Sequence, residues 1–496
     1  MPNMDSQVKK DRRAKIVATL GPSSNSKAVI EKLVDSGLNI ARLNFSHGTH
    51  ASHLKIINLI RSLPTYKTNP IVILQDLQGP KLRVGKLPPN GIELIAGEII
   101  ALEIDLDDHD INYEIAETKK IFLDIPNILH CLKPKGKILF DDGKLELEII
   151  EIIDNEIVAR VMLGGSLYSN KGVNLPGTSL DIPGFTEKDR ADLEFGLKNQ
   201  IDAVAISFVR DAEDIKCVRD FIKKKSPDNS VIPIIAKLEL PEAVRNLEEI
   251  LDAADGVMVA RGDLGVETSP SDVPVIQKEI IQAANHKSKI VITATQMLDS
   301  MINNPRPTRA EASDVANAIF DGTDAVMLSG ESANGKYPVE SVLMMDAIVR
   351  KAEKSSAKWG HQYSSSISEK SDDASAISIA ARDLAHNRDV SSVAVFTQSG
   401  RSALLESKAR PDVPILAFTP NPQTFHKLGL YWGVTPYLVP FSNTLEDMIL
   451  HVEKALLEFA NIQPGQKVIM LSGFPIGAMR STNLALLHTI GSLNIQ

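Results

Sequence analysis

The chain has 496 residues, of which 43% are hydrophobic and 24% are charged. This composition is ordinary for a folded globular protein and excludes the fibrous and disordered classes. Lysine and arginine total 54 and aspartate and glutamate total 63, and the net charge of −9 disfavours nucleic acid as a partner. The length suits about two or three domains, each with its own core.

Cysteine usage and the lack of long apolar runs indicate where the protein works. The two cysteines, Cys131 and Cys217, lack the spacing of a metal knuckle or a disulfide framework. The segment Met1–Lys15 is charged and lacks the apolar core of a signal peptide, and no run of about 18 apolar residues occurs. We therefore expect reduced thiols, a cytoplasmic location and no membrane partner.

Short apolar runs recur along the chain, each followed by an amphipathic stretch, as in parallel strands joined by crossover helices. The eight runs are Lys15–Leu20, Leu38–Leu43, Ile71–Leu74, Ala203–Phe208, Ile232–Ala236, Gly256–Ala260, Ile290–Ala294 and Ala325–Leu328. This number predicts an α/β fold built on a (β/α)₈ TIM barrel, the catalytic domain, over residues 14–78 and 179–352. Active sites of such barrels lie at the carboxyl ends of the strands.

A long insertion separates the third and fourth runs, and it exceeds a single crossover helix. Lys137–Phe140, Lys144–Ile153 and Glu156–Leu163 alternate apolar and polar residues, and Asp142-Gly143 signals a turn. We therefore expect a small, barrel-like, antiparallel β domain over residues 79–178, placed as a lid above the rim of the barrel.

The C-terminal part begins after a Ser-rich, charged segment, Lys354–Asp373, which we interpret as a linker. Strand and helix patterns alternate again beyond it, so we expect a separate α/β regulatory domain over residues 353–496. Its candidate strands are Val393–Thr397, Ile415–Phe418, Tyr437–Pro440 and Lys467–Leu471.

Two familiar nucleotide-binding signatures are absent from the sequence. Gly330–Lys336 matches most of a P-loop, but Tyr337 stands where a Ser or Thr would bind Mg²⁺, and Pro338 follows it. The motif set of eukaryotic-type protein kinases is also missing. Any phosphate chemistry must therefore use other residues.

Polar residues at the strand ends form the strongest candidate site. Glu239 follows the fifth run and Asp263 the sixth, and hard divalent cations prefer carboxylate oxygens. Lys237 can neutralise charge on a phosphoryl group during transfer. Gly262 and Asp263 sit where a helix could begin, so their N–H groups could hold an anion. A plain ion pair between Lys237 and Glu239, and a helix cap at Asp263, remain alternative readings.

Several segments match the signature motifs of the pyruvate kinase family, in that family's order. They are Asn44-Phe-Ser-His-Gly48, Lys237-Leu-Glu239, Arg261-Gly-Asp-Leu-Gly265, Thr293-Ala-Thr-Gln-Met297, Pro307-Thr-Arg-Ala-Glu311 and Asp321-Gly-Thr-Asp324. The chain resembles the family over essentially its whole length. The resemblance implies transfer of a phosphoryl group from phosphoenolpyruvate to ADP, giving pyruvate and ATP, in a homotetramer. It also implies Mg²⁺ or Mn²⁺ held by Glu239 and Asp263.

The resemblance also assigns residues to the substrates. Arg42 and Arg83 would grip phosphoryl oxygens, Lys171 would reach the nucleotide phosphates from the lid, and His47 would lie near the nucleotide. Thr295 would contact the substrate and help to protonate the enolate, with Ser329 and Glu331 nearby. The substrate-binding set is Arg42, Lys237, Gly262, Asp263 and Thr295, and its catalytic members are Lys237, Thr295 and Arg42. Rim salt bridges of the arginines, and a Thr295 hydroxyl bonded to backbone, are the alternatives.

Lys81 departs from the pattern of most family members, which carry an acidic residue at this position and need K⁺. The chain is similar here to a subgroup that is independent of monovalent cations. We therefore expect Asn44, Ser46 and Asp76 to persist as the residues of the K⁺ pocket, and Lys81 to supply the charge of the ion, so that K⁺ is dispensable. A solvated Lys81 without a role is the alternative.

The segment Thr397–Ser402 ends a predicted strand just before a helix. Its hydroxyls, backbone N–H groups and arginine suit a phosphate; the residues are Thr397, Ser399, Gly400, Arg401 and Ser402. It resembles the effector loop of bacterial pyruvate kinases that AMP or sugar monophosphates activate, which implies a phosphorylated allosteric activator. A plain capped turn is the alternative.

Two other functions compete with the kinase. One is a lyase of the aldolase type on a related barrel, but such lyases lack this lid and C-terminal domain. The other is a catalytically silent sensor that binds metabolites through Thr397–Ser402 and has a damaged catalytic site. The residues whose loss would indicate such damage are all present: Arg42, Lys237, Glu239, Asp263 and Thr295.

Overall fold

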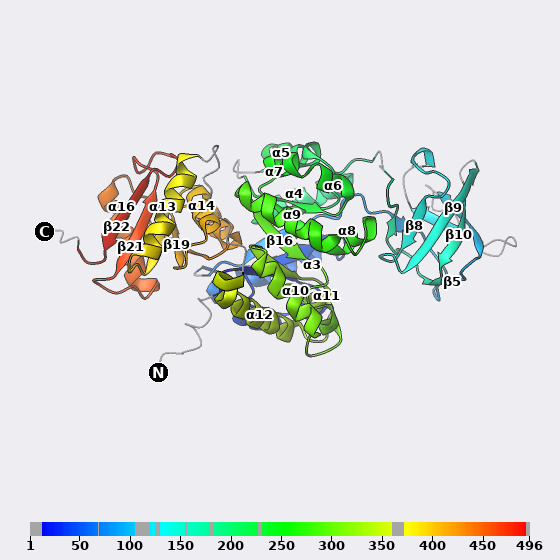
Figure 1. Cartoon of the computed structure of the whole chain (residues 1–496), viewed down its shortest axis with the longest axis horizontal. Helices are drawn as coiled ribbons and strands as arrows, with labels where there is room; N and C mark the ends of the chain where they lie inside the picture. Colours follow the sequence, from blue (N-terminus) through cyan, green and yellow to red (C-terminus); the bar gives the residue numbers. More distant parts are fainter. Residues whose placement is uncertain are drawn as a thin grey trace.

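The computed structural model describes residues 12–67, 69–104, 120–124, 129–153, 156–178, 182–226, 231–359 and 372–492. Three bodies lie in a row (Figure 1), with the barrel in the centre, the lid at one end and the C-terminal domain at the other. The described residues contain no helix that is long and apolar enough to cross a membrane. The cysteines Cys131 and Cys217 are both free.

The central body is a closed barrel of eight parallel strands, in the order β1-β17-β16-β15-β14-β13-β3-β2. The strands are β1 (Lys15–Thr19), β2 (Ile40–Asn44), β3 (Val72–Asp76), β13 (Ala203–Ile206), β14 (Ile234–Leu238), β15 (Gly256–Ala260), β16 (Ile290–Ala294) and β17 (Ala325–Leu328). Each coincides with one of the runs expected from sequence, so the barrel is confirmed. The strands are buried throughout apart from Asn44, as parallel strands covered on both faces require.

Helices surround the barrel and cover the strands. They are η2 (Pro22–Ser24), α2 (Lys27–Ser36), α3 (His50–Arg61), η3 (Pro64–Lys67), α4 (Glu187–Lys198), α5 (Ala212–Lys225), α6 (Pro241–Arg245), α7 (Leu247–Ala253), α8 (Arg261–Glu267), α9 (Val273–His286), η5 (Asp299–Ile302), α10 (Arg309–Phe320), α11 (Gly330–Ala333) and α12 (Pro338–Trp359). Thr186 and Asp189 form a capping box at the start of α4. The helix α8 begins directly after β15, which places Gly262 and Asp263 in its first turn.

The inserted lid is a β domain with two sheets. A seven-stranded sheet has the order β12-β8-β9-β10-β6-β7-β4, and β11 pairs with β5. Its elements are β4 (Arg83–Val84), β5 (Ile92–Leu94), β6 (Ile99–Ile104), β7 (Lys120–Asp124), η4 (Leu129–Cys131), β8 (Lys137–Phe140), β9 (Leu145–Ile153), β10 (Glu156–Leu163), β11 (Gly165–Leu167) and β12 (Val173–Asn174). Pairing is antiparallel except between β6 and β7, which are parallel. The expectation of an antiparallel domain is therefore correct for every other pair.

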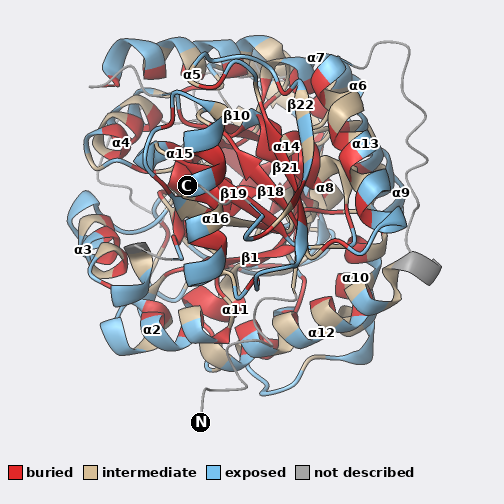
Figure 2. Cartoon of the chain, turned by 90° about the vertical axis from the view of Figure 1, so that its left-hand side faces the viewer, coloured by how far each residue is buried: buried red, intermediate tan, exposed pale blue. Residues whose placement is uncertain are grey.

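The C-terminal domain is a five-stranded sheet in the order β20-β19-β18-β21-β22 with helices around it. Its elements are α13 (Asp373–Asn387), β18 (Ser392–Phe396), α14 (Arg401–Ala409), β19 (Ile415–Thr419), α15 (Pro422–Lys427), η6 (Leu428–Leu430), β20 (Val434–Leu438), α16 (Leu445–Phe459), β21 (Lys467–Ser472) and β22 (Leu484–Thr489). The antiparallel edge strand β22 was not expected from sequence. In Figure 2 the strands of this domain form a buried layer behind helices with exposed outer faces.

The linker expected over Lys354–Asp373 is wrong in its first part. Residues Lys354–Trp359 continue α12, because Pro338 starts a helix whose buried side, including Val349 and Ala352, lies against the barrel. Residues 360–371 lie outside the described residues.

The C-terminal domain docks on the amino ends of the barrel strands. A Cβ atom at Gly429, in η6, would lie 2.8 Å from Val72 Cγ2, so glycine permits this close approach. Lys408, near the end of α14, and Arg410, which follows this helix, both pair with the buried carboxylate of Asp324, the residue before β17. Because this domain covers the amino ends, the carboxyl ends stay available for a site.

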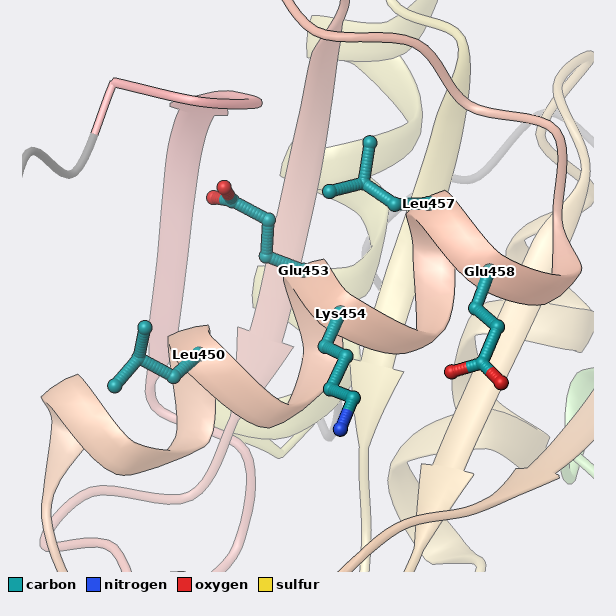
Figure 3. A pocket seen from close by; sticks show the side chains of 5 residues that line it. All are labelled: Leu450, Glu453, Lys454, Leu457 and Glu458. Atoms are coloured by element: carbon teal, nitrogen blue, oxygen red, sulfur yellow. The ribbon is translucent and has the colours of Figure 1, made fainter.

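A shallow pocket lies on the outer side of α16, in the C-terminal domain. Figure 3 shows the side chains that line it, which are Leu450, Glu453, Lys454, Leu457 and Glu458. None of these residues is a candidate catalytic residue, and α16 lies at the opposite end of the molecule from the lid (Figure 1).

Candidate active site

The rim of the barrel holds a buried carboxylate between two cations. Asp76, at the end of β3, is 1% exposed. Its Oδ2 lies 2.6 Å from Arg42 Nε, and its Oδ1 lies 3.3 Å from Lys237 Nζ. Burial alone would raise the pKa of Asp76, but the charges of Arg42 and Lys237 lower it below its ordinary value. Asp76 therefore stays ionised and fixes both cations at the rim.

Lys237 is as deeply buried as Arg42, each being 8% exposed. Its ammonium lies 2.9 Å from Glu239 Oε1 and donates a hydrogen bond of 2.6 Å to Ser207 Oγ. Burial disfavours the charged form, but the carboxylates of Asp76 and Glu239 outweigh burial and raise the pKa of Lys237. The side chain is therefore a fixed positive charge, as the chemistry of phosphoryl transfer requires.

Glu239 and Asp263 supply the acidic side of the rim. Glu239 is 1% exposed, and its Oε2 accepts a hydrogen bond of 2.7 Å from the Phe208 N–H. Burial raises the pKa of Glu239, and the nearby charge of Asp263 adds to the increase. Like charges that interact in this way favour a bound cation between them.

Glu239 and Asp263 are the candidate protein ligands of a divalent cation. Among the described residues, no group of three or more His, Cys, Asp or Glu side chains could hold a metal ion. A cation at Glu239 and Asp263 would take its other oxygens from substrate and water, which is how Mg²⁺ is commonly held in phosphoryl-transfer enzymes. The donor set therefore fits Mg²⁺.

Thr295 joins the ends of β15 and β16. Its Oγ1 accepts a hydrogen bond of 2.8 Å from the Gly262 N–H and donates one of 2.6 Å to the Ala294 carbonyl. The backbone-bonded hydroxyl that we considered as an alternative is thus present. It also places the hydroxyl beside Gly262 and Asp263, on the acidic side of the rim.

Ser329 and Glu331 follow β17. Glu331 accepts hydrogen bonds from the backbone N–H groups of Leu298, at 3.1 Å, and Ser329, at 2.7 Å. Burial raises the pKa of Glu331. Ser329 Oγ is buried and has no hydrogen-bond partner. Glu331 therefore shapes the loops after β16 and β17.

Comparison with known proteins identifies the family. The sequence matches the family model described as pyruvate kinase, barrel domain, over residues 11–342, and the one described as pyruvate kinase, alpha/beta domain, over residues 375–488. The chain belongs to the pyruvate kinase family. It is therefore a phosphotransferase whose substrates and products are phosphoenolpyruvate, ADP, pyruvate and ATP.

Curated pyruvate kinases align with nearly the whole chain. The enzyme of Geobacillus stearothermophilus is 42% identical over 488 residues, covering 97% of this chain and 81% of the relative. That of Clostridium perfringens is 40% identical over 487 residues, covering 97% and 100%. One from Agrobacterium vitis is 42% identical over 486 residues, covering 96% of each.

The candidate nucleotide-binding residues lie only partly together. Burial, followed by the charges of Arg83, Lys81 and Arg42, lowers the pKa of His47, so these cations surround it. Arg83 Nη1 donates a hydrogen bond of 2.9 Å to the Asn170 carbonyl. Lys171 instead pairs with another lid residue, Asp141, at 2.7 Å.

The lid contacts the rim of the barrel through a separate pair. Asn174 Nδ2 donates a hydrogen bond of 2.8 Å to Glu267 Oε1 at the end of α8. Lys171 and Asn174 both belong to the motif Asn170-Lys-Gly-Val-Asn174. Within this short segment Lys171 therefore contacts the lid and Asn174 contacts the barrel.

The residues of the expected K⁺ pocket have protein partners. Asn44 Oδ1 accepts a hydrogen bond of 3.1 Å from the Ser46 N–H, and Asp76 faces Arg42 and Lys237 as described. Lys81 Nζ lies 3.8 Å from Asp263 Oδ1. Lys81 thus adds its charge beside Asp263, one of the two candidate metal ligands.

The five expected effector residues form one loop at the start of α14. Thr397 Oγ1 accepts a hydrogen bond of 3.0 Å from the Gly400 N–H, and Gly400 adopts a φ of 86°, which favours glycine. Ser402 Oγ accepts a hydrogen bond of 2.6 Å from Thr482. Arg401 pairs with Asp372 at 2.5 Å.

Sequence reasoning missed Ser207, the hydrogen-bond partner of Lys237. The available signal was its position as the first polar residue within the fourth run, Ala203–Phe208. It also gave Arg261 no role, although that residue was part of a recognised motif.

Proposed function

We propose that the carboxyl rim of the barrel transfers the phosphoryl group of phosphoenolpyruvate to ADP, with Lys237 facing the group in transfer. The observation that carries this proposal is the position of Lys237 Nζ, 2.9 Å from Glu239 and 3.3 Å from Asp76, in a buried site. A fixed cation in such surroundings stabilises charge that spreads over the phosphoryl oxygens without reorganising.

Glu239 and Asp263 would hold Mg²⁺, or Mn²⁺ in its place. When bound, the cation neutralises phosphate charge and orients the substrate oxygens. Support comes from the burial of Glu239 and from its electrostatic interaction with Asp263. Lys237 offsets part of the charge of Glu239 and opposes the rise in its pKa that burial and Asp263 cause.

Arg42 and Thr295 complete the substrate site in this proposal. Arg42 is held by Asp76 and donates a hydrogen bond of 2.8 Å to Thr19 Oγ1, so its guanidinium is oriented at the rim to bind phosphoryl oxygens. The N–H groups of Gly262 and Asp263 would bind the substrate carboxylate, which requires Gly262 to exchange its bond with Thr295. Thr295 would then help to deliver a proton to the enolate.

The nucleotide would lie on the lid side of this site. Arg83, Lys81 and Arg42 surround His47, so the loop after β2 faces a cluster of positive charge that suits phosphates. Lys171 would leave Asp141 and reach the nucleotide when the lid closes.

Lys81 replaces K⁺ in this proposal. Its ammonium lies on the acidic side of the rim, 3.8 Å from Asp263 Oδ1, where it supplies a permanent monovalent charge. The pocket residues Asn44, Ser46 and Asp76 remain, but turnover would change little without K⁺.

The C-terminal domain would regulate the enzyme. Thr397–Ser402 spans the start of the nine-residue helix α14, and a phosphate at this end would gain from its N–H groups and from Arg401. An activator such as AMP or a sugar monophosphate would bind there. The homotetramer implied by the resemblance, and the cytoplasmic location expected from the cysteines and the lack of long apolar runs, belong to the same proposal.

A lactate-dehydrogenase-coupled assay with phosphoenolpyruvate, ADP and Mg²⁺ tests the proposed function. Pyruvate formation that depends on ADP and yields equal ATP supports the kinase. Carbon–carbon cleavage without ATP would support the lyase, and binding without turnover would support the sensor. Either of these results would overturn the proposal.

A further inference from the structure

Arg261 begins α8 and has no part in the mechanism above, yet its side chain is almost fully engaged. Its Nη1 donates to both carboxylate oxygens of Asp314, at 2.8 and 2.7 Å, and also lies 3.4 Å from Gln277 Oε1. Its Nη2 donates to the Thr295 carbonyl at 2.7 Å. Its Nε lies 3.2 Å from the Ala294 carbonyl. The side chain is 10% exposed, so these contacts are largely shielded from solvent, unlike those of a surface ion pair.

The backbone that Arg261 holds is in a rare conformation. Thr295 has a φ of 66° and the next residue, Gln296, has a φ of 54°. For a β-branched residue such as threonine a positive φ is a genuine outlier, and each such residue persists only where its surroundings enforce it. The guanidinium provides that enforcement because it binds the carbonyl of Thr295 itself.

The strained turn determines where the Thr295 hydroxyl lies. With the backbone in this conformation, Oγ1 reaches the Gly262 N–H at 2.8 Å, one residue after Arg261. Arg261, which follows β15, thus binds the backbone after β16. In return Thr295, which follows β16, binds the backbone after β15. Asp314, on α10, fixes the far side of the guanidinium.

We propose that Arg261, held by Asp314, is a positioning residue that keeps Thr295 in its left-handed conformation for catalysis. This inference rests on the proposed function, in which the Thr295 hydroxyl contacts the substrate. The planar, five-donor guanidinium matches the task because it binds a carboxylate and two carbonyls together, whereas the single ammonium of lysine cannot span them.

The direct test is Arg261→Lys in the coupled assay. We expect kcat to fall by about 10- to 100-fold, as a small displacement of a reacting group can cause. The KM for phosphoenolpyruvate should stay within about 3-fold, because the charge at the rim is kept. Arg219→Lys is the matched control, since Arg219 also pairs with an aspartate, Asp255 at 2.9 Å, and binds a carbonyl. The control should retain wild-type kcat.

A double-mutant cycle separates positioning from general stability. If Arg261 acts through Thr295, Arg261→Lys should cost less than about 3-fold in a Thr295→Ala background. Gln296→Gly should restore much of the kcat lost in Arg261→Lys, because glycine adopts a positive φ without help. Gln296 is exposed, so we expect the single variant to behave as wild type.

Three results would overturn the inference. They are a wild-type kcat for Arg261→Lys, losses that multiply fully with Thr295→Ala, and a wild-type kcat for Thr295→Ala alone. If Arg261→Lys does not fold, Asp314→Asn replaces it in the same cycle, with the same expected coupling to Thr295. The proposed function is judged separately, since it fails only if the wild-type enzyme makes no ATP-linked pyruvate.

Discussion

Lys81 Nζ lies 3.8 Å from Asp263 Oδ1, which places an ammonium group beside one of the two candidate metal ligands. Both side chains are partly exposed, at 28% and 22%, so the pair adds at most about 1 kcal/mol to stability. Its effect is therefore expected in the electrostatics of the site.

Removal of K⁺ should change the turnover of the wild-type enzyme by less than about 2-fold, because Lys81 supplies the charge. Lys81→Glu should lose activity in K⁺-free buffer and regain much of it when K⁺ is added. The measurement is initial rate in tetramethylammonium buffer with and without KCl. A loss of about tenfold or more in the wild-type enzyme without K⁺ would refute the role of Lys81.

Glu239→Gln and Asp263→Asn should each raise the Mg²⁺ concentration for half-maximal activity by at least about tenfold, because each removes a charged oxygen ligand. Glu267→Gln is the matched control, since Glu267 is a nearby carboxylate whose Oε1 binds Asn174 at 2.8 Å. Its Mg²⁺ requirement should stay near that of wild type. Direct Mn²⁺ binding, followed by electron paramagnetic resonance, should weaken in the first two variants. Unchanged binding in both would exclude this pair as the metal site.

Ribose 5-phosphate, AMP or fructose 1,6-bisphosphate should shift the saturation curve for phosphoenolpyruvate to lower concentrations. Arg401→Ala should lose the shift, because it removes the guanidinium at the start of α14, whereas the exposed Arg388→Ala should keep it. The measurement is the half-saturating substrate concentration with and without each compound. If none of the three has an effect, Thr397–Ser402 is better explained as a capped turn.

Glu406, on α14, should make the stability of the C-terminal domain depend on pH. It is fully buried, and neither carboxylate oxygen has a hydrogen-bond partner. Burial raises its pKa from 4.5 to about 8, although the charge of Arg382 opposes this. The folded state thus keeps the proton to higher pH than the unfolded chain does. The free energy of unfolding of the C-terminal domain should therefore fall as pH rises from about 4.5 to about 8.

Glu406→Gln should remove this pH dependence and exceed the wild-type free energy of unfolding at pH 8 by roughly 1–3 kcal/mol. Near pH 5 the two proteins should be similar. Urea unfolding at both pH values, with the exposed Glu458→Gln as control, measures the difference. Equal pH dependence in wild type and Glu406→Gln would show that Glu406 does not hold this proton.

The barrel and its rim were predictable because buried parallel strands leave a clear pattern. Runs such as Gly256–Ala260 are wholly apolar, and the first polar residues after them mark the carboxyl ends. The edge strand β22 was missed because its sequence, LALLHT, does not alternate between apolar and polar residues. Its burial nevertheless alternates over most of its length, because the strand pairs with β21 alone and lies at the edge of the sheet. The domain boundaries at 79–178 and 353–496 remain predictions.

The contacts of individual site residues were less predictable than the strands. Lys237 binds Ser207 in addition to Asp76 and Glu239, and the partners of Arg261 come from α9, α10 and the end of β16. Such pairs join segments that only the closed barrel brings together, and no local pattern specifies them. The left-handed conformation of Thr295 is likewise set by those tertiary contacts, since its own propensity opposes it.

The rate of ATP-linked pyruvate formation by Lys237→Met tests the central claim most directly. The rate should fall by at least about 10³-fold, because the ammonium group that stabilises the phosphoryl group during transfer is lost. Lys289→Met, which removes a lysine that donates to the Ala254 carbonyl at the other end of the barrel, should keep most of the activity. A Lys237→Met enzyme with the wild-type rate would contradict the account.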